Sequence, residues 1–211
     1  MKAWITAIIL AVAAATAFFI PREDFDYYIL SLSWTPSWCA EAGDARGAAQ
    51  CEAGRGYGFT LHGLWPQYER GGWPADCSSQ SEPPTRAATA AMVDIMGDAG
   101  LAAYEWRKHG TCTGLSPQDY FKASRQAYDS IVRPASLRQR AGSGHANPSD
   151  IEAAFLKANP GLAPDQITVT CKSNRIQEVR ICLTKDLRWR DCAADARRDC
   201  TISGAGFQPV R

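Results

Sequence analysis

Two short segments of the sequence carry side chains suited to acid–base chemistry. The first, Phe59–Pro66, runs FTLHGLWP and contains His62, and the second, Tyr104–Cys112, runs YEWRKHGTC and contains His109. Imidazole titrates near pH 6.5, so one histidine can donate a proton while another accepts one under ordinary conditions. The chain has three histidines, and two of them fall in these segments. The segments therefore predict a paired general acid and general base.

The second segment adds two charged groups to this pair. On a helix, Glu105, Lys108 and His109 occupy positions i, i+3 and i+4 and share one face. An acid, a cation and an imidazole would then reach one small ligand, and the cation could stabilise negative charge that develops on a phosphoryl group. Taken alone, a Glu-x-x-Lys pair on a helix is usually a surface salt bridge, and a single histidine is more often structural than catalytic.

The two segments resemble the signatures of the ribonuclease T2 family, a block F-T-x-H-G-L-W-P followed by a block H-E-W-x-K-H-G-T-C. The stretch Asp26–Cys39 is similar to the first strand of that family, and the C-terminal strand and cysteines are similar in layout. The resemblance implies a metal-independent endoribonuclease that needs no cofactor. Such enzymes cleave single-stranded RNA by attack of the ribose 2′-hydroxyl on the adjacent phosphate, giving a 2′,3′-cyclic phosphate and then a 3′-phosphate.

Matching positions carry the family's roles onto this chain. The resemblance implies that His109 takes the proton of the 2′-hydroxyl and that His62 protonates the departing 5′-oxygen. The opposite assignment stays open, and the two roles exchange in the hydrolysis step. Glu105 and Lys108 would stabilise the negatively charged phosphorane. Trp65 would pack at the phosphate and first base, because aromatic rings stack well on single-stranded bases.

Two positions depart from the family pattern. Tyr104 opens the second block where the family has a phosphate-binding histidine; a phenol donates a hydrogen bond but carries no positive charge. We expect weaker phosphate binding or a shifted pH profile from this change. Gln67 stands where some members have an aspartate that biases base choice, so base preference does not transfer. Trp73 could line the same base site or anchor its own loop.

The elements that must position these residues follow from residue patterning. Aromatic and branched residues predict strands at 27–34, 57–64, 166–171, 176–184 and 187–192. Helices are predicted at 86–96 and 101–109, after a cap at Ser116, and after a capping box that begins at Ser149. His145 lies in a Gly-rich stretch typical of an exposed loop. This order favours one α+β domain, with a central, mainly antiparallel sheet packed against several helices.

The chain contains eight cysteines, an even number that favours four disulfides in an exported protein. None of their spacings is C-x-x-C, which argues against a zinc site. The sequence alone leaves the pairing open. The family resemblance implies Cys77–Cys112, which would tie the two catalytic segments together, and we add Cys39–Cys51, Cys171–Cys200 and Cys182–Cys192.

The N-terminus indicates the compartment. Lys2, an apolar run and the triplet Ala15–Ala17 form the layout of a secretory signal peptide cleaved after Ala17. An uncleaved membrane anchor is the alternative, but no basic cluster follows the apolar run. We expect a signal peptide over 1–17 and one domain over 18–211, secreted or periplasmic, monomeric and without stable membrane association.

Composition limits the remaining function classes. A hydrophobic fraction of 45% supports a packed core, and a net charge of +1 excludes a protein that coats nucleic acid by charge alone. A metal-dependent nuclease or phosphatase would need a cluster of Asp, Glu or His ligands that the sequence does not provide. A secreted module that binds RNA or a host molecule without catalysis is the other alternative; Tyr104 leaves room for it, and the intact histidine blocks count against it.

Overall fold

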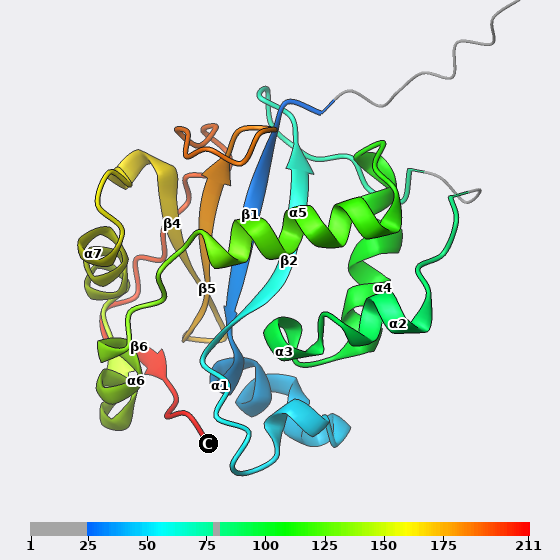
Figure 1. Ribbon diagram of the computed structural model, residues 1–211. Helices are drawn as coiled ribbons and strands as arrows, with labels where there is room; N and C mark the ends of the chain where they lie inside the picture. The colour runs from blue at the N-terminus through cyan, green and yellow to red at the C-terminus, as the bar shows by residue number, and fades with distance from the viewer. Residues whose placement is uncertain (1–24, 78–80) are drawn as a thin grey trace, which may run out of the picture.

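The computed structural model describes residues 25–77 and 81–211, and a six-stranded sheet forms its centre (Figure 1). The strand order is β2-β1-β5-β6-β3, and β4 pairs with β5. The strands are β1 (Tyr27–Trp34), β2 (Phe59–Gln67), β3 (Gly144–Ala146), β4 (Ile167–Lys172), β5 (Arg175–Leu183) and β6 (Ala205–Phe207). The pairings within the described residues are antiparallel apart from the short parallel contact of β5 with β6. The predicted mainly antiparallel sheet is confirmed, whereas the predicted signal peptide lies outside the described residues.

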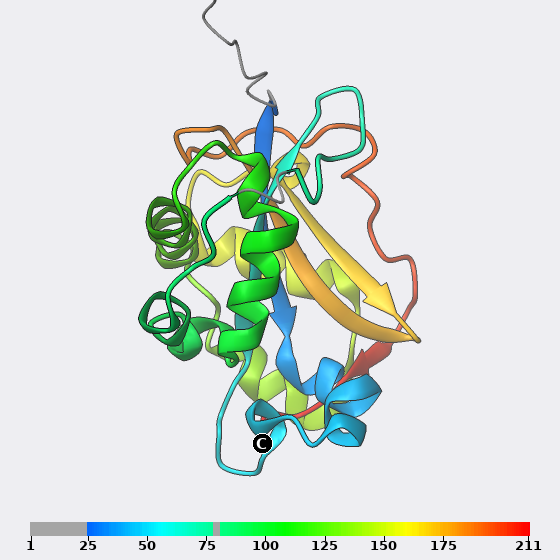
Figure 2. The same ribbon diagram turned by 90° about the vertical axis from the view of Figure 1, so that its right-hand side faces the viewer.

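Helices surround this sheet, and several of them cover one of its faces. The helices are α1 (Thr35–Trp38), α2 (Arg86–Ala90), α3 (Val93–Met96), α4 (Ala99–Lys108), α5 (Pro117–Asp129), α6 (Ser136–Arg140) and α7 (Pro148–Ala158). Figure 1 shows α5 crossing in front of β1 and β2, and Figure 2 shows α2, α4 and α5 on the same side of the sheet. In the described part of the chain, no helix is both long and apolar enough to cross a membrane.

The side chains of strand β1 alternate between the two faces of the sheet. Leu30 and Leu32 are fully buried in the main core beneath the helices. Ser31 and Ser33 point to the opposite face, because successive side chains of a strand alternate in direction. Two small polar residues therefore occupy the middle of the face that the helices leave open.

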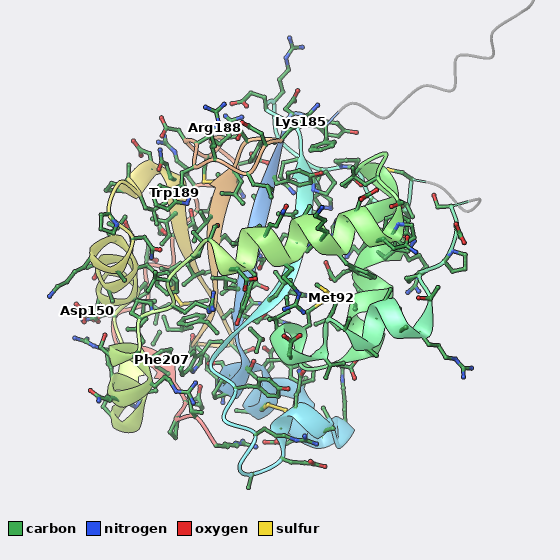
Figure 3. All side chains as sticks on the ribbon, in the orientation of Figure 1. Met92, Asp150, Lys185, Arg188, Trp189 and Phe207 are labelled. Carbon is green, nitrogen blue, oxygen red and sulfur yellow. A yellow bond between two sulfur atoms is a disulfide. The ribbon has the colours of Figure 1, made fainter. Side chains whose placement is uncertain are left out.

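Two predicted helices differ from those observed. The predicted helix over 86–96 is broken into α2 and α3 by a turn, where Met92 is buried and points into the core (Figure 3). The predicted capping box at Ser149 is wrong, because α7 begins at Pro148 with Asn147 as its N-cap and no side-chain cap hydrogen bond. Proline suits the first helical position, where its missing N–H would have no partner. The predicted cap at Ser116 is present and accepts a hydrogen bond from the Asp119 N–H.

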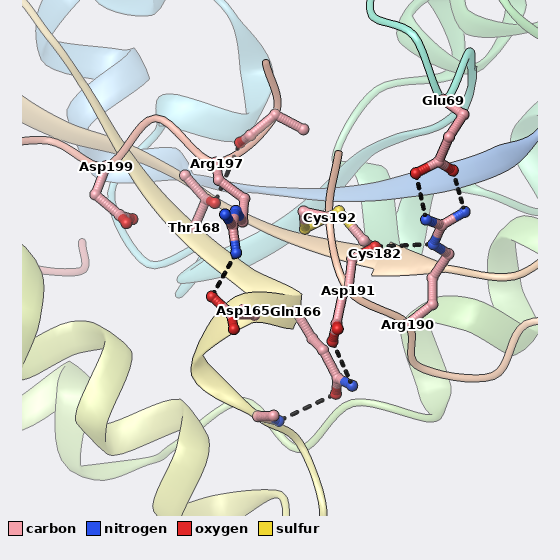
Figure 4. Close-up of a disulfide and its surroundings, with 12 residues drawn as sticks. Glu69, Asp165, Gln166, Thr168, Cys182, Arg190, Asp191, Cys192, Arg197 and Asp199 are labelled. Atoms are coloured by element: carbon pink, nitrogen blue, oxygen red, sulfur yellow. Dashed lines mark hydrogen bonds and ion pairs between the residues drawn. A yellow bond between two sulfur atoms is a disulfide. The ribbon is translucent and has the colours of Figure 1, made fainter. Parts of the chain in front are cut away.

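The predicted strand over 187–192 is also wrong, since that segment makes only an isolated bridge between Leu183 and Trp189. A disulfide, an ion pair and backbone hydrogen bonds hold this segment in place instead, as Figure 4 shows around the Cys182–Cys192 disulfide. Arg190 forms an ion pair with Glu69 at 2.7 Å, and its backbone N–H donates to the Cys182 carbonyl. Cross-links of this kind leave no periodic trace in the sequence.

Four disulfides link the described cysteines. They join Cys39 to Cys51, Cys77 to Cys112, Cys171 to Cys200 and Cys182 to Cys192. These are the four pairs expected from the sequence. The second of them connects the loop after β2 to the turn that follows α4, so it joins the two segments singled out for their chemistry.

Candidate active site

A β-bulge in β2 places His62. In the pairing with β1, Leu32 lies opposite Leu61 and Ser31 lies opposite Gly63, so His62 is the extra residue. The bulge keeps Leu61 and Leu64 in the core and leaves His62 and Gly63 together on the open face. Bulges commonly redirect a side chain next to an active site. The local break in the strand thus presents the imidazole to solvent, with 32% of its side chain exposed.

Helix α4 brings the second set of residues to the same place. Asp98 caps its first turn by accepting from the Leu101 N–H, and His109 follows its last residue. Glu105 and His109 are both buried, whereas Lys108 is half-buried. The expected common face of the helix therefore lies against the sheet at the bulge.

Trp65 lies close to both histidines. Its Nε1 donates a 2.7 Å hydrogen bond to Glu105 Oε2. Its ring centre lies 5.1 Å from that of His62 and 5.5 Å from that of His109. Gly63 permits this arrangement, because a Cβ there would collide with both Glu105 Oε2 and Trp65 Nε1. The structure thus brings His62, Trp65, Glu105 and His109 together around one indole.

His62 is surrounded by negative charge. Its Nδ1 lies 2.5 Å from Glu178 Oε1, and its Nε2 lies 3.7 Å from Glu105 Oε1. Burial opposes protonation of the ring, but the hydrogen bond to Glu178 and the charges of Glu178 and Glu105 outweigh it and raise the pKa of His62. The environment therefore favours the imidazolium form.

His109 has the opposite environment. Burial, followed by the positive charges of Lys108 and His62, lowers the pKa of His109 to about 3. Its Nδ1 is buried and, within the described residues, has no hydrogen-bond partner. The ring is therefore neutral across the mildly acidic and neutral range and can accept a proton.

Lys108 and Tyr104 form a pair at the edge of the site. The Lys108 Nζ lies 5.4 Å from the centre of the Tyr104 ring, and hydrogen bonding to Tyr104 raises the pKa of Lys108. Lys108 therefore stays charged beside the two histidines. Burial raises the pKa of Glu105 in turn, although the charges of His62 and Lys108 and the hydrogen bond from Trp65 oppose it.

In the described part of the chain, the other two predicted substrate-binding residues make no hydrogen bond or ring contact with this cluster. Gln67 is buried, and its side-chain amide donates a 2.9 Å hydrogen bond to the carbonyl oxygen of the preceding Pro66. Trp73 is 57% exposed on the loop between β2 and Cys77. His145, expected in an exposed loop, is exposed on β3, and its Nδ1 lies 3.2 Å from the Gly204 carbonyl oxygen.

Sequence reasoning missed Glu178 and Arg180 of β5. Arg180 contacts Glu178 Oε2 through Nε at 2.9 Å and through Nη2 at 2.7 Å, and its guanidinium lies 5.2 Å from the Trp65 ring centre. The available signal was a pair of opposite charges two residues apart in a predicted strand. Such a pair shares one face, and that face proves to be the one that carries His62.

A cavity of about 560 Å³ opens beside His62. His62, Ser33, Tyr104 and Glu178 line it, and Arg46, Lys172 and Arg175 also contribute to its wall. Its volume falls within the usual range of small-molecule sites. In the described part of the chain, no group of three or more His, Cys, Asp or Glu side chains is arranged to hold a metal ion.

Comparison with known proteins identifies the family of this chain and its activity. The model of the ribonuclease T2 family matches residues 25–192. The chain belongs to the ribonuclease T2 family. A ribonuclease of Aeromonas hydrophila is 31% identical over 165 residues, covering 77% of this chain and 74% of that protein. Membership of the family and these ribonuclease relatives make this protein an endoribonuclease.

Solved structures agree with the fold of the T2 family. An RNase-related protein from Calystegia sepium has a TM-score of 0.69 at 23% identity, covering 88% of this chain and 98% of that one. RNase NT in complex with 5′-AMP has a TM-score of 0.66 at 22% identity, covering 89% of this chain and all of the other. At these identities the likeness concerns the fold alone.

Proposed function

We propose that this T2 enzyme cleaves single-stranded RNA without a metal ion, with His109 as general base and His62 as general acid. The opposite pKa shifts of these two histidines, whose rings both lie beside Trp65, carry the proposal. A neutral His109 is ready to accept a proton, and a protonated His62 is ready to donate one. This favours one of the two assignments that the sequence left open.

The first step exchanges one P–O bond for another. The 2′-hydroxyl oxygen attacks the adjacent phosphorus while His109 takes the hydroxyl proton, and the P–O5′ bond breaks while His62 protonates the departing 5′-oxygen. The products are a 2′,3′-cyclic phosphate and a free 5′-hydroxyl. In the second step water attacks the cyclic phosphate while His62 takes its proton, and the P–O2′ bond breaks while His109 protonates the 2′-oxygen, which gives a 3′-phosphate and restores both histidines.

The neighbouring groups would stabilise the negative charge that builds up on the phosphorane. Lys108 supplies a permanent cation beside His109, and Glu105 is fixed by its hydrogen bond from Trp65. Tyr104 is 39% exposed beside Lys108 and can donate a hydrogen bond to a phosphate oxygen. Trp65 would contact the phosphate and first base, and the exposed Trp73 ring offers a second stacking surface.

The substrate and compartment belong to the same proposal. The cavity beside His62 has room for a nucleotide next to the scissile bond, and a structural relative binds 5′-AMP. Four disulfides and the predicted signal peptide support a secreted or periplasmic enzyme. We further propose that it acts as a monomer with no stable membrane association.

The decisive experiment is mass spectrometry of the products from a short defined RNA in the presence of EDTA. Wild-type protein should yield 2′,3′-cyclic phosphate ends first and 3′-phosphate ends later. His62→Ala and His109→Ala should each abolish cyclic phosphate formation while circular dichroism stays unchanged, and His145→Ala should cleave like wild type. RNA left intact by the wild type, or turnover retained in either active-site variant, would contradict the proposal; binding without cleavage would indicate a non-catalytic module.

A further inference from the structure

Glu178 is a buried carboxylate with two charged partners, His62 and Arg180. It is 1% exposed, one oxygen contacts His62 Nδ1 at 2.5 Å, and the other accepts two hydrogen bonds from Arg180. An ionised carboxylate out of contact with water is costly unless it is paired and hydrogen-bonded. Burial opposes its ionisation, but the hydrogen bond and charge of His62, together with Arg180, hold the pKa of Glu178 at about 2. It therefore remains an anion throughout the working range.

This anion determines which nitrogen of His62 faces the reaction. An ionised carboxylate can only accept hydrogen bonds, so the hydrogen bond between His62 and Glu178 requires a hydrogen on Nδ1 of His62. Nε2 is then the nitrogen left to exchange a proton with substrate, and it lies on the side of Glu105. A carboxylate that orients an imidazole in this way also stabilises its protonated form.

The contact between His62 and Glu178 spans an intervening strand. Ser33 of β1 pairs with Thr60 of β2 on one side and with Glu178 of β5 on the other. Neighbouring strands lie about 4.8 Å apart, so side chains of β2 and β5 meet only if the residue between them is small. Ser33 is small enough to leave room for the side chains of His62 and Glu178 to meet, and its own hydroxyl lies 3.5 Å from Glu178.

We propose that Glu178, held in place by Arg180, positions His62 for proton donation during RNA cleavage, a role that rests on the function proposed above. Glu178 itself does not touch the reacting atoms, so it is a positioning residue. Arg180 orients the carboxylate through its two hydrogen bonds and extends over the Trp65 ring.

Within the described residues, the charged and titratable groups that face His62 come from two elements. Glu178 and Arg180 face it from β5, Glu105 faces it from α4, and His109 lies beside the Trp65 ring at the end of that helix. The two β5 residues have opposite effects, since the Glu178 charge raises the pKa of His62 and the Arg180 charge lowers it. Removing Glu178 should therefore lower the pKa of His62, whereas removing Arg180 should raise it or leave it in place.

The first test is an NMR titration of the histidine ring signals, which needs no catalytic activity. In Glu178→Gln the pKa of His62 should fall by about 1 to 3 units, and in Arg180→Gln it should rise or stay in place. Glu152→Gln, on α7, is the matched control and should leave His62 unchanged, while the exposed His145 serves as an internal reference. General damage to the site would shift both β5 variants in the same direction and would overturn the proposal, as would an unchanged titration in Glu178→Gln.

The second test is steady-state cleavage of a dinucleotide. Glu178→Gln should lower kcat at least tenfold with little change in KM, and the alkaline limb of its pH profile should move to lower pH. Glu178→Asp keeps the charge and should recover part of kcat with the alkaline limb restored. A loss that appears in KM alone, or equal loss in both variants with no change of pH profile, would overturn the role. If wild-type protein cleaves no RNA, the proposed function fails, whereas the NMR titration still tests the contact.

Discussion

At the scale of residues, the central chemical property of this site is that the pKa of His62 is raised while that of His109 is lowered. Burial beside Lys108 keeps His109 neutral, and two carboxylates keep a proton on His62. Neither ring achieves this alone, because an isolated imidazole titrates near pH 6.5. The shifts arise from which side chains the fold places within a few ångströms, so the pair acts as a unit.

This arrangement predicts the pH dependence of RNA cleavage. In the proposed mechanism the base must be free, which holds above the His109 pKa of about 3, and the acid must be protonated, which holds below the raised His62 pKa. The kcat/KM profile should therefore show a broad plateau over mildly acidic pH, with loss near pH 3 and again as the pH rises through the His62 pKa, which is raised above 6.5. A profile measured with a dinucleotide checks this, and a sharp optimum above pH 8 would contradict both assignments.

Glu178 and Arg180 illustrate what sequence reasoning could not supply at this scale. The two histidine blocks are local patterns, so His62, Glu105, Lys108 and His109 could be proposed from the sequence. The contact of His62 with Glu178 depends instead on the register of three strands. A shift of one residue in the pairing of β1 with β5 would turn Glu178 to the other face of the sheet.

Among the elements, strand β2 depends on a close approach at its bulge. In Gly63→Ala the new methyl group would displace Glu105 or Trp65 and break the hydrogen bond between them. We expect a fall in kcat of more than tenfold and a loss of about 1–3 kcal/mol in the free energy of unfolding, the usual cost of overpacking. Kinetics and urea denaturation measure the two effects.

Gly142→Ala is the matched control for that substitution. A Cβ at Gly142 meets nothing within 4 Å, and the residue lies far along the chain from the site. It should leave kcat unchanged. If Gly63→Ala behaved like Gly142→Ala, the close packing of Trp65 on Glu105 would be irrelevant to the reaction.

The elements themselves were predictable to different degrees. β1 was predicted with its observed bounds because its residues are aromatic or branched along most of its length. The start of α7 was misplaced because two capping signals overlap, and Pro148 fixes the earlier one. The short strands β3 and β6 pair over three residues each, too few for any periodicity to indicate them.

For the whole molecule, the Cys77–Cys112 disulfide connects stability with catalysis. It closes 35 residues and fixes the Trp73 loop beside the end of α4, where the Asp76 N–H also donates to the Lys108 carbonyl. Replacing both cysteines by serine should cost about 2–4 kcal/mol of unfolding free energy and also lower kcat/KM. Denaturation and cleavage assays would be read on the same preparation.

The Cys171–Cys200 pair provides the comparison for that experiment. It closes 29 residues, so its removal should cost a similar free energy of unfolding. It joins β4 to the C-terminal segment, and kcat/KM of the folded variant should stay near that of wild type. Equal losses of activity in the two double variants would mean that global stability alone accounts for the effect.

The small residues in the middle of β1 impose a hidden constraint on how this sequence can diverge. In a library that varies β1 and is selected for RNA cleavage, the positions that face the helices would accept apolar residues of similar volume. Survivors at positions 31 and 33 would instead keep small side chains, since a bulky one would keep the side chains of β2 and β5 from meeting over β1. Selection would thus preserve small residues at two positions that do not touch the reacting atoms.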